Sequence, residues 1–544
     1  MYLFNHKLVT VSTLCLVLFL TACGSNNKND KADKQVLNWN EKTELPTIDP
    51  SLAMDGTSFD MLNNSMDGLY RLGKKSKITP GLAKSAKVSS DGLKYTFQLR
   101  RNTKWSNGDT VTAKDFVYSW RRTVDPKTNS GYAYLFDGIK NATDISNEKK
   151  AVDSLGIKAV GKYKLEVSLD KQIPYFKLLM GFPIFFPQNE KAVQKYGNKY
   201  GTASKYMVYN GPFKMSGWTG TNLNWKLIKN PTYWDKKAVK LSQINFKVNK
   251  STTTSYNLYQ SRKLDETELS AEQAKALNKK KGYQVLPSAT TYYLGFNKEN
   301  HSGLESKKIR QAISYAIDRK QFVNKVLGNT GMVSKGIVSS KLASYQGKDF
   351  ADEAQTTAGV SYDKDKAQRL LKEGLNEIGK KELKLNLLTD DTDANKKNVE
   401  FLQSQIEEHL DGKVKISTTS VPFKTRLARS TAGDYDLVLQ YWGADFADPI
   451  TFLQIFSGDN PSKTGGWKDA TFDKLIKDSM TVHSMDQGKR WNDMLQASKI
   501  LSEQQVIAPL YQAKTPAMVS PKVKGLIMNT AGVSNNWKYT YISE

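Results

Sequence analysis

Leu437-Val438-Leu439-Gln440-Tyr441 is a short apolar run that predicts a buried β-strand, and Trp442-Gly443-Ala444-Asp445 follows it directly. The preceding segment 383–417 predicts a β-α-β unit, because its apolar residues alternate, then recur at helical spacing until Gly412, and the chain then becomes extended again. Such a unit has a right-handed crossover and belongs to an α/β sheet. Open α/β sheets bind ligands outside the carboxyl ends of their strands, so the residues after Tyr441 are candidates for a binding site.

The rest of the chain mixes helices with strands. Apolar residues at helical spacing predict a helix over 309–317, and residues 112–115 form a capping box that starts another helix. Alternation predicts strands over 95–99, after the turn at Asp91-Gly92, and over 164–169. A mature chain of roughly 500 residues exceeds what one hydrophobic core normally serves, so we expect two or three domains.

The N-terminus has the pattern of a secretory signal. Lys7 precedes an apolar run over 8–20, which is shorter than the roughly 18 to 20 residues of a membrane-spanning helix. Small residues precede Cys23, as in a lipobox, where the cysteine is diacylated and becomes the first mature residue. We therefore predict a signal peptide over 1–22, a lipid anchor on Cys23 and a flexible tether over 23–35. The alternative is an ordinary cleavage site with an incidental cysteine.

Cysteine and histidine are too scarce for several kinds of site. The cysteines are Cys15 and Cys23, so the folded part has no thiol for a disulfide, a metal or a nucleophile. Past the leader only His301, His409 and His483 remain, and none has metal-ligand spacing. We therefore expect no catalytic residues, no metal and no cofactor in a protein that is not an enzyme; an extracellular hydrolase is the alternative.

The partners that the strong positive charge suggests depend on the compartment in which the protein lies. The formal charge of +26 falls by one to +25 when Lys7 leaves with the signal peptide. In a cytoplasmic protein such a charge suggests nucleic acid as a partner. An exported protein meets cell-wall polymers and lipid headgroups instead, through an attraction that salt screens. We expect no nucleic acid partner and interpret most of the charge as a solvated lysine-rich surface.

Many short motifs follow one another in the order of a known family. They are Asp67-Gly68-Leu69-Tyr70, Pro80-Gly81-Leu82-Ala83, Asp91-Gly92-Leu93-Lys94-Tyr95-Thr96-Phe97, Trp105-Ser106-Asn107-Gly108, Thr112-Ala113-Lys114-Asp115-Phe116-Val117-Tyr118-Ser119-Trp120, Asn210-Gly211-Pro212-Phe213, Asn230-Pro231-Thr232-Tyr233-Trp234, Ile309-Arg310-Gln311-Ala312, Ala316-Ile317-Asp318-Arg319, Asp445-Phe446-Ala447-Asp448-Pro449 and Ala508-Pro509-Leu510-Tyr511. One such motif carries little weight, but this many in order are specific. Over nearly its whole mature length the chain resembles the extracellular solute-binding proteins of family 5, the class of the peptide-binding lipoproteins of oligopeptide permeases.

The resemblance implies an α/β fold of the periplasmic-binding-protein type II. This fold is a clamshell of two α/β lobes with an additional mixed domain packed on one lobe. The implied parts are lobe I over 36–69, 188–286 and 511–544, an extra domain over 70–187, and lobe II over 287–510. Hinges are expected near Pro287 and Leu510.

The resemblance also implies a peptide held as an extended strand between the lobes. Asp445 matches the position whose carboxylate receives the peptide's α-ammonium group, which is too costly to bury unpaired. The residues Tyr441, Trp442 and Gly443 lie where the strand of the family meets its ligand. The opposite backbone is expected from the turn Asp55-Gly56-Thr57. A local backbone cap is the alternative role for Asp445.

Three tyrosines complete the implied binding site. Tyr132 corresponds to a ligand-facing aromatic residue of the extra domain, while Tyr292 and Tyr293 lie at the junction of the lobes. Core packing is the alternative for each of them. By contrast, Asp448 precedes Pro449 and an apolar run, and we interpret it as the structural N-cap of a helix.

The function implied by the resemblance is capture of extracellular oligopeptides and their delivery to the permease subunits of an ABC transporter. We expect a monomer that is lipid-anchored on the outer face of the cell membrane of a Gram-positive bacterium. Peptide length, peptide sequence and the group that holds the peptide's C-terminus stay open. The alternatives are capture of a signalling peptide such as a pheromone, or binding of an oligosaccharide, a metal chelate or haem on the same fold.

Overall fold

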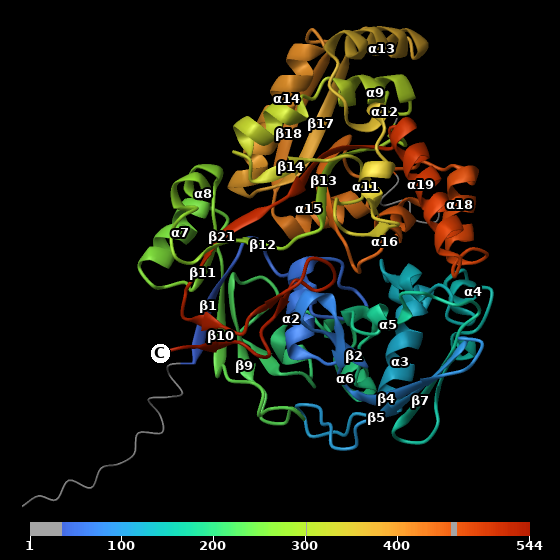
Figure 1. The fold of residues 1–544 in the computed structure, drawn as a ribbon, viewed down its shortest axis with the longest axis vertical. Helices are drawn as coiled ribbons and strands as arrows, with labels where there is room; N and C mark the ends of the chain where they lie inside the picture. Colours follow the sequence, from blue (N-terminus) through green and yellow to red (C-terminus); the bar gives the residue numbers. More distant parts are fainter. Residues whose placement is uncertain (1–34, 301, 459–464) are drawn as a thin grey trace, which may run out of the picture.

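The computed structural model describes residues 35–300, 302–458 and 465–544. The predicted signal peptide, the lipid anchor at Cys23 and residue His301 lie outside the described residues. Figure 1 shows an upper and a lower lobe, with the chain passing between them near β12 and β21. No helix in the described ranges is long and apolar enough to cross a membrane.

Lobe I, as the structure shows it, is built on two sheets. One has the order β1-β10-β9-β8, with β1 parallel to β10, and the other has the order β11-β21-β12. Its elements are β1 (Val36–Glu41), α2 (Gly56–Ser65), α6 (Glu190–Tyr196), β8 (Phe213–Ser216), β9 (Asn224–Lys229), β10 (Gln243–Val248), α7 (Thr252–Gln260), β11 (Glu266–Glu268), α8 (Ala271–Leu277), β12 (Tyr283–Leu286), β21 (Thr515–Val519), β22 (Val523–Lys524), β23 (Ile527–Met528), β24 (Asn535–Asn536) and β25 (Tyr541–Ile542). Trp537 packs edge-on against Trp39 and Phe246, each at 5.3 Å between ring centroids. The end of the chain therefore completes the core that the first strand begins.

The extra domain is built on the antiparallel sheet β4-β5-β7-β6. Its elements are β2 (Tyr70–Leu72), β3 (Ile78–Pro80), β4 (Ala83–Val88), β5 (Lys94–Leu99), α3 (Ala113–Val124), α4 (Ala142–Ser146), β6 (Ile157–Ala159), β7 (Lys164–Ser168) and α5 (Phe176–Leu179). The predicted capping box is confirmed, because Thr112 and Asp115 cap the first turn of α3. The predicted strands are confirmed as β5 and β7, and Gly92 turns the chain into β5 with a φ of 70°.

Lobe II is built on one mixed sheet with the order β14-β20-β13-β19-β17-β18. Its elements are β13 (Thr290–Phe296), α9 (Lys307–Tyr315), α10 (Arg319–Gln321), β14 (Gly331–Val333), β15 (Ser344–Tyr345), β16 (Lys348–Asp349), α11 (Phe350–Glu353), α12 (Thr357–Val360), α13 (Lys364–Glu377), β17 (Leu383–Asp390), α14 (Asp393–His409), β18 (Val414–Val421), α15 (Phe423–Thr431), β19 (Leu437–Gly443), α16 (Ile450–Leu453), α18 (Ala470–Met480), α19 (Gln487–Glu503) and β20 (Ile507–Ala513). The predicted helix over 309–317 is confirmed as α9. The predicted β-α-β unit is confirmed as β17, α14 and β18, whose strands pair in parallel.

The chain passes between lobe I and lobe II twice. The first crossing lies between β12 and β13, where a hinge near Pro287 is expected. The second hinge, expected near Leu510, is displaced: β20 continues through Leu510 and pairs with β14 as far as Ala513. The crossing therefore falls at Lys514, between β20 and β21, because the sheet of lobe II holds the strand past the expected boundary.

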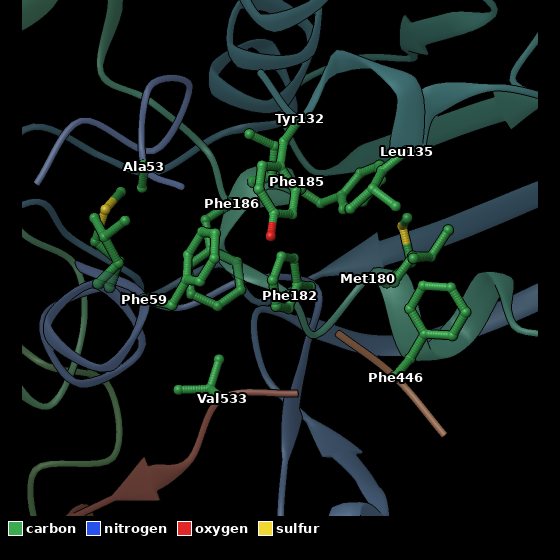
Figure 2. Packing of buried hydrophobic residues seen from close by; sticks show 14 of the residues in the cluster. Ala53, Phe59, Tyr132, Leu135, Met180, Phe182, Phe185, Phe186, Phe446 and Val533 are labelled. Atoms are coloured by element: carbon green, nitrogen blue, oxygen red, sulfur yellow. The ribbon is translucent and has the colours of Figure 1, made fainter. Parts of the chain in front are cut away.

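One hydrophobic cluster joins the extra domain to both lobes. Figure 2 shows Tyr132 and Phe182 of the extra domain beside Phe59 of α2, with Phe446 and Val533 reaching the same cluster from late in the sequence. The ring of Phe59 lies 4.7 Å from that of Phe182 and 5.3 Å from that of Tyr132. Tyr132 is consequently held where the three parts of the molecule meet.

Candidate functional site

The carboxyl-terminal half of β19 presents an open backbone edge. In an antiparallel pair, successive residues direct their N–H and C=O groups to opposite sides of the strand. The N–H of Ala444 donates to the carbonyl of Ala289 on the β13 side at 2.9 Å, so the backbone groups of Tyr441 and Gly443 point the other way. On that side, within the described chain, β17 pairs with β19 only at residues 437–438. An extended ligand can therefore pair with Tyr441 and Gly443.

Asp445 lies at the end of this edge, where lobe II meets the extra domain. Its side chain is buried, with 6% of the residue exposed. One carboxylate oxygen accepts a hydrogen bond from the Tyr132 hydroxyl at 3.3 Å, and the other accepts one from the Thr451 hydroxyl at 3.2 Å. Burial, and then the charge of Asp445, raise the pKa of Tyr132 well above its ordinary value, so this phenol stays a donor.

Trp442 supports the same corner through its ring. The indole N–H donates to the carbonyl of Thr451 at 3.0 Å, and the ring stacks on Tyr132 with centroids 5.9 Å apart. Trp442 thus lies on the side of the sheet opposite its neighbour Tyr441, because successive strand residues alternate between the two faces. The structure places Trp442, Tyr132 and Asp445 together.

A cavity of about 90 Å³ lies between lobe I and lobe II beside β19. It is large enough to hold water. Most of the residues that line it are polar in type, and they come from both lobes: Asn40, Lys42, Thr43, Asn249, Lys250, Thr252, Ser255, Glu268, Tyr292, Asp390, Thr392, Ala394, Asn395, Tyr441 and Tyr511. The ring of Tyr292 lies 5.0 Å from that of Tyr441 and 4.6 Å from that of Tyr511, which gives the cavity one aromatic wall.

Tyr293 does not line this cavity, and the structure favours core packing, the alternative role for this residue. It is fully buried and packs against Phe456 at 6.3 Å between ring centroids. The physical reason is the strand period: Tyr292 points to the cavity, so the next residue points into the core. The Tyr293 hydroxyl is buried without a hydrogen-bond partner in the described part of the chain.

The segment Asp55-Gly56-Thr57 is the start of α2 rather than a separate turn. Asp55 is its N-cap, and the carboxylate accepts from the Ser58 N–H at 2.9 Å and from the Ser58 hydroxyl at 2.6 Å. Burial raises the pKa of Asp55 to about 6. The charge of Asp55 also contributes to the raised pKa of Tyr132, so the start of α2 lies near the Asp445 corner. A Cβ added to Gly56 would meet nothing within 4 Å. Contact of these residues with ligand stays a prediction.

The structural role predicted for Asp448 is supported, although the N-cap residue of α16 is Pro449 and not Asp448. Its carboxylate accepts from the N–H of Ile450 at 3.0 Å, at the start of α16. Both terminal nitrogens of Arg490 also donate to it, each at 2.8 Å, which holds α19 against this turn. Asp448 is therefore structural, although the sequence pattern did not reveal Arg490 as its partner.

The binding residues predicted from the sequence do not include the charged residues that line the cavity. Lys42 pairs with Glu268 at 3.2 Å, and this carboxylate raises the pKa of Lys42. Lys42 directly follows β1, Lys250 follows β10 and Asp390 is the last residue of β17. The rule that points to Asp445, that sites lie beyond the carboxyl ends of strands, could therefore have found all three.

Comparison with known proteins identifies the family. Residues 77–464 match the model of the bacterial extracellular solute-binding proteins, family 5. A dipeptide-binding protein of Lactococcus lactis is 38% identical, and the match covers 98% of this chain and 99% of the relative. The structure of Listeria monocytogenes OppA bound to peptide is 39% identical and superposes with a TM-score of 0.90 over 94% of this chain and 99% of that chain.

Two structures of one relative show how the lobes are arranged. The Escherichia coli murein tripeptide binding protein MppA, 28% identical, superposes with a TM-score of 0.85, covering 94% of this chain and 99% of that chain. The unliganded open form of MppA, 27% identical, reaches only 0.60, covering 94% and 98%. Because sequence similarity and coverage are nearly equal, the difference reflects lobe arrangement, and the lobes of this protein are closed. The chain belongs to family 5 of the bacterial extracellular solute-binding proteins.

Proposed function

We propose that this protein binds peptides between its lobes and delivers them to the permease of an ABC transporter. The observation that carries the proposal is the open edge of β19, where Tyr441 and Gly443 offer backbone groups in line with the buried carboxylate of Asp445. A peptide is the ligand class that supplies both a complementary backbone and a terminal ammonium group. The relatives named as dipeptide-binding and peptide-bound proteins support the same ligand class.

The geometry supports recognition of the peptide backbone rather than of its sequence. Strand addition gives affinity through main-chain hydrogen bonds, while side chains enter separate pockets. A peptide that extends along β19 from an ammonium group held at Asp445 would bring later side chains to the cavity beside Tyr441. A polar pocket that keeps water tolerates side chains of different kinds.

The charge of the ammonium group supports the role of Asp445. An α-ammonium group taken out of water needs a hydrogen-bonded counter-charge. Asp445 is a buried carboxylate already oriented by the hydroxyls of Tyr132 and Thr451. These contacts hold the carboxylate in place before ligand arrives, which lowers the entropy lost on binding.

Attachment to the outer face of the cell membrane is part of the proposal. The motif around Cys23 supports a diacylated cysteine, and two acyl chains are what stable anchoring requires. We propose a monomeric solute-binding protein without catalytic activity, anchored beside the permease that receives its ligand.

Native mass spectrometry of the purified mature protein, followed by denaturation, tests the proposed ligand. Co-purified peptides of mixed sequence support general peptide uptake, and one dominant peptide supports capture of a signal. A sugar, a metal chelate or haem recovered in place of peptide would contradict peptide binding. The Asp445→Asn variant, purified in parallel, should carry less peptide per protein molecule.

A further inference from the structure

Tyr134 lies at the Asp445 corner, and no group in the part of the chain that the structure describes satisfies its hydroxyl. Its ring is 5.5 Å from that of Tyr132, two residues earlier in the same short segment. The hydroxyl oxygen is buried and has no hydrogen-bond partner among the described residues. Burial, and then the charge of Asp445, raise the pKa of Tyr134 well above its ordinary value, so the phenol is neutral and its oxygen lies within the field of this carboxylate.

A buried hydroxyl without a partner costs free energy, and a partner that comes with the ligand removes this cost. We propose that the Tyr134 hydroxyl is a second phenolic contact of the ligand's terminal ammonium group, and that it selects for peptides with a free amino terminus. This inference rests on the proposed peptide-binding function. It concerns a residue of the extra domain, which thereby takes part in recognition through Tyr134 as well as Tyr132.

The count of donors and acceptors supports this assignment. A primary ammonium group has three N–H donors. The Tyr132 hydroxyl gives its hydrogen to Asp445, so its oxygen remains an acceptor. The carboxylate of Asp445 and the phenolic oxygens of Tyr132 and Tyr134 are acceptors that the side chains of this corner provide for these donors. A group with fewer N–H donors can satisfy fewer of these acceptors.

A purely structural role for Tyr134 makes a different prediction. Its ring packs against the main hydrophobic cluster, so loss of packing would change stability and the affinity for every ligand alike. Contact with the ammonium group changes only the affinity for peptides that carry one. The substitution Tyr134→Phe separates the two roles, because it removes the oxygen and keeps the ring.

We expect Tyr134→Phe to weaken binding of a peptide with a free amino terminus by roughly tenfold or more, the range of a hydrogen bond to a charged group. Binding of the same peptide with an acetylated amino terminus should not change. The unfolding midpoint of the ligand-free protein should stay the same or rise, because an unsatisfied hydroxyl is removed. Isothermal titration calorimetry and thermal unfolding provide these measurements.

Tyr293→Phe is the matched control, because Tyr293 also buries a hydroxyl without a partner in the described chain but lies in the core of lobe II. It should leave the affinity for both peptides unchanged.

A dimethylated amino terminus keeps its charge but has only one N–H. It should lower the affinity of the wild-type protein, and this loss should be smaller in Tyr134→Phe. Equal losses for free and acetylated peptides, or no loss, would overturn the inference. If Asp445→Asn still weakens binding in that case, the proposed function stands and only the role of Tyr134 fails.

Discussion

Lys250 of lobe I lies 2.7 Å from Asp391 of lobe II, and the same ammonium group lies 2.5 Å from Glu44 of lobe I. Glu44 also accepts from the N–H of Phe423 at the start of α15, at 3.2 Å. The carbonyl of Lys250 accepts from the N–H of Asp393 at the start of α14, at 3.4 Å. Because Phe423 begins α15, Glu44 also lies at the positive end of the dipole of α15. The two lobes are thus joined directly by ionic and hydrogen-bonding contacts between protein groups.

The first prediction concerns this ionic contact between the lobes. Lys250→Met should favour the open form of the ligand-free protein by about 1 kcal/mol, or roughly fivefold in the open-to-closed ratio, as for a partly exposed ion pair. Distances between spin labels on the two lobes measure the change. Lys42→Met is the control, because Lys42 pairs with Glu268 of its own lobe. An equal effect of both substitutions on the ligand-free protein would contradict the prediction.

The second prediction concerns Asp445. Asp445→Asn should weaken binding of a peptide with a free amino terminus by about 2 to 5 kcal/mol, the range for removing one partner of a buried charge pair. The acetylated peptide should lose far less, because it brings no charge to the site. Titration calorimetry of both peptides on both proteins measures the difference. Unchanged affinity for the free peptide would rule out the assignment.

The third prediction concerns stability and pH at the start of α2. Burial raises the pKa of Asp55 from 3.8 to about 6, and the hydrogen bonds from Ser58 oppose this shift. Between about pH 4 and pH 6 the folded protein holds a proton that the unfolded chain has lost. The contribution of Asp55 to the free energy of unfolding therefore falls as pH rises through this window, by up to about 3 kcal/mol.

Asp55→Asn tests this pH dependence while keeping a good helix N-cap. We expect urea unfolding of the variant to show a flatter dependence on pH between about 4 and 6 than the wild type shows. Asp91 is a suitable site for a control substitution, because it is fully exposed and its pKa is lowered rather than raised. The same slope in wild type and Asp55→Asn would show that Asp55 does not titrate in this window.

The fourth prediction concerns the lipid anchor. Cys23→Ala should move the protein from the membrane fraction to the soluble fraction of the producing cells, because the acylated residue is lost. Peptide affinity should not change, since Cys23 is not among the residues predicted to bind peptide. Fractionation after a high-salt wash measures attachment without the electrostatic contribution. Attachment that persists after the wash would contradict a lipid anchor on Cys23.

The elements of the fold could be predicted from the sequence where periodicity is strong. Alternation correctly predicted β17, helical spacing α14 and a continuous apolar run β19, because the pattern of apolar residues follows the pattern of burial in each element. The end of lobe II could not be placed in this way. Apolar residues continue through β20 past Leu510, and only pairing with β14 shows that the sheet ends at Ala513.

The candidate site was predictable at Asp445 and only partly elsewhere. Tyr292 and Tyr293 are adjacent residues of the same type. The sequence alone cannot say which of them faces the cavity, because that depends on which face of the sheet is covered. The contact of Lys250 with Asp391 depends on how the lobes close, since the two residues are 141 positions apart. Tyr134 gave no signal, because an unsatisfied hydroxyl is recognised only when its surroundings are known.

The packing of Trp537 on Trp39 constrains the order in which the parts of this protein can fold during synthesis. Lobe I contains both the first strand and the last residues, so its core cannot close until almost the whole chain has been synthesised. Lobe II has its sheet complete once β20 has emerged and can fold earlier. A nascent chain therefore keeps lobe I incomplete for nearly all of its synthesis. Under the proposed export, this delay leaves lobe I unfolded while the chain passes through a membrane channel.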